Sequence, residues 1–128
     1  MKLLLDSCSF LWITTAHAEL SSAARTAFEN ESNEAYLSVV SAWEIAIKNG
    51  LRSLSLPEPV QVFLSRARIL HKIESLNLSE EAIVQLPRLP PLHRDPFDRM
   101  LVCQAIAEGM AILTPDELIR QYPVRTIW

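Results

Sequence analysis

Glycine is scarce in this chain of 128 residues, which contains only Gly50 and Gly109. Loops that wrap a phosphate and turns that bind a dinucleotide need several glycines within one short segment. The sequence therefore excludes both of these nucleotide-binding motifs. Hydrophobic residues make up 49% of the chain and charged residues 21%, which is typical of a packed globular protein. The length predicts one domain, spanning residues 1–128.

The chain also has only two cysteines and no long hydrophobic run. Cys8 and Cys103 have neither C-x-x-C nor zinc-ligand spacing, so we expect reduced thiols in a cytoplasmic protein. No segment approaches the roughly 18 consecutive apolar residues of a membrane span. The apolar N-terminus is interrupted by Asp6 after three leucines, so we expect neither a signal peptide nor a membrane anchor.

Basic residues do not outnumber acidic ones. Twelve Lys and Arg stand against fifteen Asp and Glu, a formal net charge of −3, whereas a protein that holds nucleic acid by charge alone is normally basic. Nine of the basic residues are arginines, which are the better phosphate ligands. These numbers argue against a broad basic surface and leave open a polyanion bound through a metal ion.

Short apolar runs alternate with helical patterns along the chain. Strands are expected at Lys2–Leu5, Ala35–Ser38, Lys72–Leu76, Ala111–Leu113 and Val124–Trp128. Helices are expected at 7–15, 21–30, 39–49, 57–70, from residue 79, at 95–108 and at 115–121. Gly50 in a left-handed conformation closes the third helix and Gly109 ends the sixth. This alternation predicts an α/β fold with a parallel sheet covered on both faces, whose ligands bind at the carboxyl ends of the strands.

Aspartate is the rarer acid, with four Asp against eleven Glu. Asp6 and Asp95 suit helix N-caps, and Asp98 and Asp116 suit the first turn of a helix, where an acid favours the helix dipole. Capping explains Asp95 best, because Pro96 follows it at the first helical position.

Two other local patterns involve acids. Glu44 stands four residues before Lys48, the favourable order for an ion pair. Its neighbours in SVVSAWEIAIKNG are apolar, so its carboxylate can equally point into the cleft at the strand ends. Thr114 and Glu117 have the spacing of a capping box.

The acids are better explained jointly than one at a time. Asp6 follows the first expected strand, Asp116 follows the strand at 111–113, and Glu44 and Asp98 lie near the starts of helices on the same edge. We therefore expect these four carboxylates to converge. Carboxylates so close repel one another, and a hard divalent cation, Mg²⁺ or Mn²⁺, relieves that repulsion. Such a site promotes attack of water on a phosphodiester.

Four segments resemble the PIN domain, and most of all the bacterial VapC-like toxin ribonucleases of type II toxin–antitoxin systems. They are LLLDS…LW at 3–12, SVVSAWEIAIKNGL at 38–51, HRDPFDRMLVCQAIAEG at 93–109 and ILTPDELIRQY at 112–122. The resemblance implies a three-layer α/β/α fold with a five-stranded parallel sheet. It implies Mg²⁺- or Mn²⁺-dependent cleavage of RNA that leaves a 5′-phosphate and a 3′-hydroxyl. It also implies an antitoxin protein as partner and a homodimer.

The same resemblance assigns roles to individual positions. The residues expected to bind metal and catalyse are Asp6, Glu44, Asp98 and Asp116. The residues expected to support them are Ser7, Thr114 and the capping Asp95. Independently of the resemblance, Arg94 and Arg99 flank these acids, so they are expected either to grip RNA phosphates or to be solvated charges at the helix end. Where the family often has a histidine, this chain has Cys8.

Other interpretations fit less well or remain open. A haloacid dehalogenase-type phosphatase needs a second Asp at position 8, which is Cys8, and the three lysines do not suit a receiver domain. A catalytically degenerate PIN fold that binds RNA or protein remains the alternative. We expect His93 to be a structural loop residue, since no nucleophile accompanies it, and Trp43 and Cys103 to lie in the core.

Overall fold

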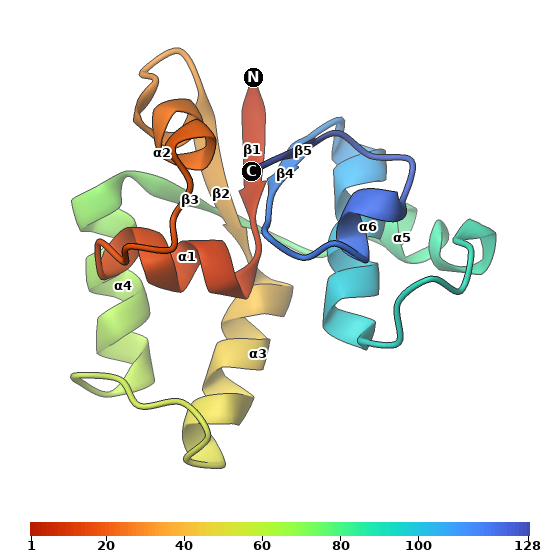
Figure 1. Cartoon of the computed structure of the whole chain (residues 1–128). Coiled ribbons are helices and arrows are strands. Elements are labelled where there is room, and N and C mark those ends of the chain that lie inside the picture. The colour runs from red at the N-terminus through yellow and green to blue at the C-terminus, as the bar shows by residue number, and fades with distance from the viewer.

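The computed structural model describes all 128 residues and contains a five-stranded parallel sheet (Figure 1). Its strands are β1 (Lys2–Leu5), β2 (Glu34–Ser38), β3 (Ile73–Leu76), β4 (Ala111–Leu113) and β5 (Thr126–Ile127). They lie in the order β3-β2-β1-β4-β5, and all four neighbouring pairs are parallel. The predicted α/β fold with a five-stranded parallel sheet is confirmed.

Six α-helices cover the sheet. They are α1 (Ser7–Thr14), α2 (Ser22–Glu29), α3 (Val39–Gly50), α4 (Val60–His71), α5 (Glu80–Ile83) and α6 (Pro96–Glu108), with two 3₁₀ turns, η1 (Leu86–Arg88) and η2 (Ile119–Gln121). The starts of α2, α5 and α6 are set by Ser21, Ser79 and Asp95, whose side chains accept hydrogen bonds from first-turn amides. None of these helices combines the length and the apolar character needed to cross a membrane.

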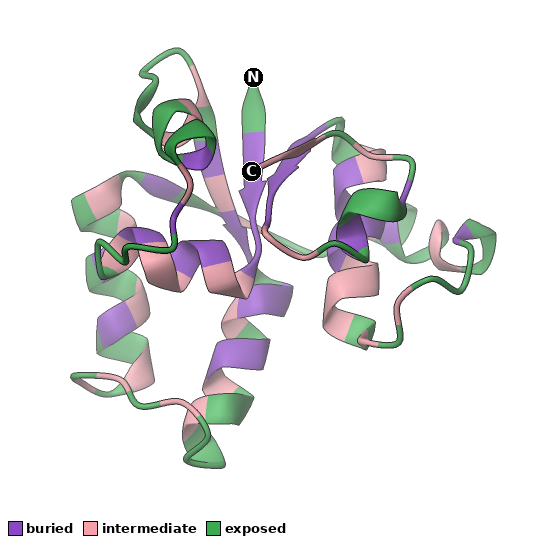
Figure 2. Ribbon diagram, viewed as in Figure 1, coloured by how far each residue is buried: buried purple, intermediate pink, exposed green.

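The central strand β1 separates two hydrophobic cores. Leu3 and Leu5 pack with α1, α2, α3 and α4, whereas Leu4 packs on the other face with α5, α6 and η2. All three leucines are fully buried, and Figure 2 shows β1 and β4 mostly buried at the centre of the molecule. Cys103 is fully buried in the second core, as predicted. Helices on both faces explain why β1 is a continuous apolar run instead of an alternating one.

The carboxyl ends of three strands share one edge of the sheet. Leu5 at the end of β1 is in register with Leu37 of β2 and with Leu113 of β4. The chain leaves β1 at Asp6 and β4 at Thr114, so these residues start from neighbouring points. The topology therefore brings two distant parts of the sequence together where ligands of parallel sheets bind.

The end of α3 differs from the prediction, because Gly50 is its last helical residue and the left-handed residue is Arg52, with φ of 61°. The Arg52 amide donates to the Asn49 carbonyl and the Ser53 amide to the Lys48 carbonyl. This pair of bonds forms a Schellman motif, which displaces the turn by two residues. Gly109, with φ of 66°, ends α6 where the sequence predicts.

The segment 115–121 is not the predicted helix. Only η2 forms there, and the amides of Leu118 and Ile119 are capped by the Asp116 side chain. Tyr122 precedes Pro123, which disfavours helical backbone at Tyr122, so three residues remain for the turn. The Thr114 hydroxyl accepts from the Asp116 amide and is not paired with Glu117 in a capping box.

Candidate active site

One cavity of about 260 Å³ lies at the carboxyl edge of the sheet. The residues that line it are Asp6, Ser7, Cys8, Glu44, Lys48, Asp95, Asp98, Pro115 and Asp116. The four acids named from the sequence are all among them, and they come from the ends of β1 and β4 and from α3 and α6. The expected convergence of these carboxylates is therefore present in the structure.

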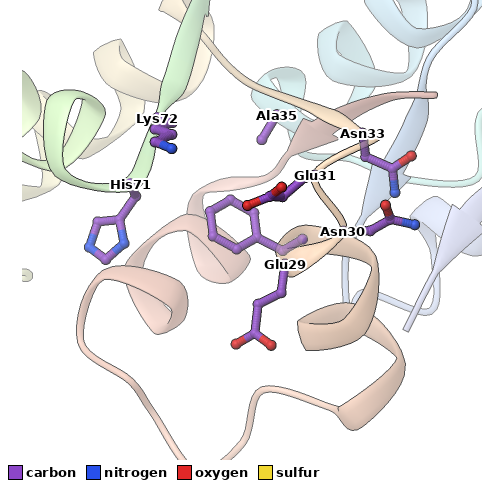
Figure 3. Close-up of a pocket in the computed structure, with 8 residues that line it drawn as sticks. Glu29, Asn30, Glu31, Asn33, Ala35, His71 and Lys72 are labelled. Carbon is purple, nitrogen blue, oxygen red and sulfur yellow. The ribbon is translucent and has the colours of Figure 1, made fainter.

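A larger cavity, of about 450 Å³, lies at the opposite edge, around the start of β2 and the ends of α2 and α4. Its lining includes Glu29, Glu31, His71 and Lys72. These side chains spread apart instead of pointing to a common centre (Figure 3), and no ion pair joins them. This cavity presents no converging set of chemical groups.

Asp6 is held rigidly on both carboxylate oxygens. Its Oδ1 accepts from the Ser9 amide at 2.7 Å, which caps α1 as predicted, and its Oδ2 accepts from the Thr114 hydroxyl at 2.5 Å. The residue is 4% exposed. Burial raises the pKa of Asp6, and these hydrogen bonds partly oppose the rise. Thr114 therefore orients the first acid, and it does so across the β1–β4 boundary.

Glu44 fulfils both roles that its sequence position allowed. It is 4% exposed and lines the cavity, and its Oε2 also forms the expected pair with Lys48 Nζ at 2.9 Å. The Ser7 hydroxyl donates to Glu44 Oε1 at 2.5 Å. The hydrogen bond with Glu44 raises the pKa of Lys48, so the lysine stays charged. Lys48 is the one Lys or Arg side chain that lines this acidic cavity.

The carboxyl of Asp98 has a strongly raised pKa. Burial, followed by the charges of Asp95 and Glu44, raises its pKa from 3.8 to about 7, while the charge of His93 acts to lower it. Because an isolated carboxyl titrates near 4, a pKa near 7 reports mainly a carboxyl removed from water, with neighbouring acids further disfavouring its charged form. Asp95 itself accepts from the amides of Phe97 and Asp98 and caps α6, as predicted.

Asp116 has the opposite pKa shift. Burial acts to raise its pKa, but hydrogen bonds from the Ile119 amide, the His93 ring and the Leu118 amide outweigh burial and lower it. One of its oxygens caps η2 and the other faces His93. Asp98 and Asp116 therefore lie close together with different proton affinities, as in sites where neighbouring acids have different roles.

The sequence interpretation missed His93 as a site residue. Its Nε2 lies 3.1 Å from Asp98 Oδ2 and 3.1 Å from Asp116 Oδ2. Its Nδ1 accepts from the Asp95 amide at 3.1 Å. The signal that could have revealed it is the spacing in HRDPFD, because a histidine two residues before an N-cap can accept the cap's own amide. A loop histidine was expected, and the loop brings it between two of the acids.

The two arginines expected to grip RNA differ in their surroundings. Arg99 Nη1 donates to the Pro90 carbonyl at 3.1 Å and to Tyr122 Oη at 3.2 Å, so it braces the loop before α6. Arg94 is exposed and forms no hydrogen bond or ion pair within the protein. Cys8 lines the cavity, and burial together with the charge of Asp6 raises the pKa of its thiol to about 11, so the thiol stays protonated.

The expectation that Trp43 lies in the core is wrong. Its side chain is 61% exposed and contacts the edge of the Phe97 ring, with centroids 5.0 Å apart. The inward face of α3 is formed by Ser41, Glu44 and Ile45, which are buried, and successive helix residues point about 100° apart. Trp43 is therefore turned to the outside by the same helical rotation that turns Glu44 inward.

The donor atoms in this cavity fit a hard divalent cation. They are carboxylate oxygens, which Mg²⁺ and Mn²⁺ prefer, and the pKa of Asp98 is raised first by burial and then by the neighbouring charges of Asp95 and Glu44. One oxygen each of Asp98 and Asp116 lies with a His93 nitrogen inside a group whose atoms are all within 4.8 Å of one another. Asp98 and Asp116 are thus close enough to share one ion.

Comparisons with known proteins agree with this fold. VapBC2 from Rickettsia felis, solved with a promoter DNA fragment, is similar at a TM-score of 0.74 and 17% identity over 98% of this chain and 97% of that one. DNA-bound VapBC from Salmonella typhimurium has a TM-score of 0.70 and 17% identity over 98% and 96%. VapBC-1 from nontypeable Haemophilus influenzae has a TM-score of 0.65 and 11% identity over 98% and 96%.

At such identities these structures show a shared fold. No curated protein sequence matches the chain. The sequence profile of the PIN domain, however, matches residues 3–124, a span that contains every acid of the cavity. The chain therefore belongs to the PIN domain family.

Proposed function

We propose that this chain is a divalent-metal-dependent endoribonuclease and the toxin of a type II toxin–antitoxin pair. The observation that carries the proposal is the convergence of Asp6, Glu44, Asp98 and Asp116 on one cavity, with the pKa of Asp98 at about 7. PIN domains are typically nucleases, and an acidic site that binds a divalent ion suits hydrolysis of a phosphodiester.

In this proposal the four acids hold one Mg²⁺ or Mn²⁺ through their oxygens. Such an ion, when bound, lowers the pKa of water and neutralises charge that develops on the phosphoryl oxygens. The protein orients the acids beforehand, because the Thr114 hydroxyl fixes Asp6 and the Ser7 hydroxyl fixes Glu44. No side chain forms a covalent bond to RNA. Water attacks the phosphorus and O3′ of the preceding nucleotide leaves as the hydroxyl, so the products carry a 5′-phosphate and a 3′-hydroxyl.

The basic residues at the cavity then have separate roles. Lys48 is half exposed at 52% and directs its charge to Glu44 at the cavity, where a phosphate would dock. Arg94 is exposed and unpaired, so it is free to bind RNA phosphates. Arg99 acts instead by bracing the loop through Tyr122.

The direct test is cleavage of single-stranded RNA by the purified protein. We expect cleavage with Mn²⁺ or Mg²⁺, none with EDTA, and recovery when excess Mn²⁺ follows EDTA, because the acids alone cannot neutralise the phosphate. Fragment ends are identified by their susceptibility to a 5′-phosphate-dependent exonuclease. Cleavage that persists in EDTA, or fragments ending in a cyclic phosphate, would contradict the proposal.

A degenerate PIN fold that binds without cutting is distinguished by calorimetry with Mn²⁺. The proposed nuclease should bind Mn²⁺ and lose that heat signal when Asp6 and Asp98 are both changed to Asn. An inert fold would give the same weak heat of Mn²⁺ binding whether positions 6 and 98 are Asp or Asn. RNA affinity measured in parallel shows whether an inert protein still binds its ligand.

An antitoxin partner is the second part of the proposal. The similar structures from Rickettsia felis and Salmonella typhimurium are VapBC complexes bound to DNA. We propose that this chain likewise pairs with a small protein encoded beside it. Co-expression with the adjacent reading frame should yield a co-purifying complex in which RNA cleavage is suppressed, and free cleavage by a co-purified complex would argue against an antitoxin.

A homodimer is supported by an apolar stripe on α3 and the residue after it. Val39, Trp43, Ile47 and Leu51 are all exposed and recur every four residues, the spacing of one helix face. Burying such a stripe against a second copy would remove it from water.

We therefore expect a dimeric mass by light scattering and a monomeric mass for Trp43→Glu, because a charge would be buried at the contact. Ile69→Glu is the matched control, since Ile69 is 81% exposed on α4 and should leave the mass unchanged. A monomeric wild-type protein, or a dimeric Trp43→Glu, would refute this interface.

A further inference from the structure

His93 occupies an unusual place, because it touches two acids that lie 18 residues apart in sequence. The imidazole side chain is 12% exposed, and its Nε2 lies 3.1 Å from an oxygen of Asp98 and 3.1 Å from an oxygen of Asp116. Judged by proximity alone, the ring would count as a third metal ligand beside these carboxylates. The hydrogen bond at the other ring nitrogen, Nδ1, argues against metal binding by the ring.

The proton on the ring is assigned by the backbone. His93 Nδ1 accepts a hydrogen bond from the Asp95 amide at 3.1 Å, and a backbone amide can only donate. Nδ1 therefore carries the lone pair, and in the neutral ring the proton is on Nε2. That N–H points at the carboxylates of Asp98 and Asp116. An ionised carboxylate has no proton to donate, so both groups accept the hydrogen bond.

Binding a metal through Nε2 would require this proton to move to Nδ1. The Nδ1–H would then face the Asp95 N–H, so two donors would oppose each other in a half-buried loop. The loop offers little room to relax, because the His93 amide donates to Tyr122 Oη at 2.9 Å and Arg99 donates to the same oxygen. The backbone thus locks the ring in the donating form.

We infer that His93 is a positioning residue and not a metal ligand: its Nε2–H, fixed by the Asp95 amide, holds Asp98 and Asp116 together for a divalent cation. The inference rests on the proposed function, since it concerns how the same cavity receives its ion. His93 supplies attraction between the two acids through their Oδ2 atoms, and it leaves Oδ1 of Asp98, which accepts no hydrogen bond within the protein, free for the ion. Hydrogen bonds to ligating carboxylates typically contribute about 10–100-fold to metal affinity.

The first test is made on the wild-type protein and needs no variant. Two-dimensional ¹H–¹⁵N spectra of the imidazole rings in metal-free protein should show His93 with a protonated Nε2 and an unprotonated Nδ1. Pulsed electron paramagnetic resonance of the Mn²⁺-loaded protein should show no directly coordinated imidazole nitrogen. The opposite tautomer, or a strong ¹⁴N coupling that disappears in His93→Ala, would overturn the inference.

The second test compares variants by Mn²⁺ affinity in the absence of RNA. His93→Ala should bind Mn²⁺ about 10–100-fold more weakly, whereas His93→Gln, whose amide can donate at the Nε2 position, should recover most of the loss. His71→Ala is the matched control, because His71 lies at the other cavity. Equal weakening by Ala and Gln would overturn the inference.

The two proposals fail in different ways. Wild-type protein that binds no Mn²⁺ and cuts no RNA would overturn both the proposed function and the positioning role of His93. Wild-type protein that binds Mn²⁺ with His93 coordinated would overturn only the positioning role. If His93→Ala does not fold, as judged by circular dichroism, the tautomer and the ¹⁴N coupling of the wild-type protein still decide the matter.

Discussion

Replacing Asp98 by Asn should lower the rate of RNA cleavage about a thousand-fold or more at saturating Mn²⁺. The change removes one negative charge from the cavity while keeping the shape of the side chain, so an oxygen ligand of the proposed ion is weakened. Loss of several kcal/mol of transition-state stabilisation corresponds to a rate loss of this size. Asp6→Asn should behave in the same way, because the buried Asp6 is held toward the same cavity.

This loss can be separated from unfolding. Asp98→Asn should melt at the same or a higher temperature than the metal-free wild type, since the wild-type carboxyl is destabilised by burial and by its acidic neighbours. Glu108→Gln is the control, because Glu108 is an exposed acid at the other end of α6, and it should cleave RNA at the wild-type rate. Undiminished cleavage by either Asp98→Asn or Asp6→Asn would refute the proposed mechanism.

The stability of the metal-free protein should fall as pH rises from about 4.5 to about 7.5. Asp98 has a pKa of about 7 when folded and an ordinary value of 3.8, so within this window the folded state holds a proton that the unfolded state has released. Stability decreases with pH wherever the folded state binds more protons. The pKa of Asp6 is also raised and acts in the same direction. The loss is up to about 4 kcal/mol from Asp98.

Metal should reverse this trend at neutral pH. A ligand at 100 times its dissociation constant stabilises the folded state by about 2.7 kcal/mol, and Mn²⁺ requires the ionised carboxylates that neutral pH provides. Thermal melts between pH 4.5 and 7.5 in EDTA and in excess Mn²⁺ measure both effects. The Asp98→Asn variant should show a flatter pH dependence in EDTA. Melting temperatures in EDTA that rise steadily with pH would contradict the assignment of Asp98.

Much of the fold follows from local patterns in the sequence. The limits of α6 were predicted correctly because Asp95-Pro96 and Gly109 are strong start and stop signals. Convergence of the four acids followed from the parallel sheet, since residues after its strands meet at one edge. The topology thus predicted which acids meet, although it did not predict their different pKa shifts, which depend on burial.

Two of the errors come from hydrogen bonds that the folded chain makes, and a third comes from the direction in which a helix face points. Gly50 was expected to be left-handed, but the amides of Arg52 and Ser53 donate back to the carbonyls of Asn49 and Lys48, which moves the left-handed residue to Arg52. Thr114 was expected to cap a helix, but its hydroxyl donates to Asp6, which is 108 residues away. Trp43 was placed in the core because its neighbours in the sequence are apolar, whereas the direction in which a helix residue points depends on which face of the helix packs on the rest of the protein.

The hydrogen bond between Thr114 and Asp6 also means that the cavity forms late in the synthesis of the chain. The first strand leaves the ribosome with Asp6, and β2 and β3 can pair beside it, but its other neighbour, β4, begins only at Ala111. A nascent chain that ends before Pro96 therefore contains Asp6 and Glu44 without Asp98 and Asp116, and the edge of β1 stays open. In the proposed nuclease, the set of four acids is complete only once Asp116 has been synthesised.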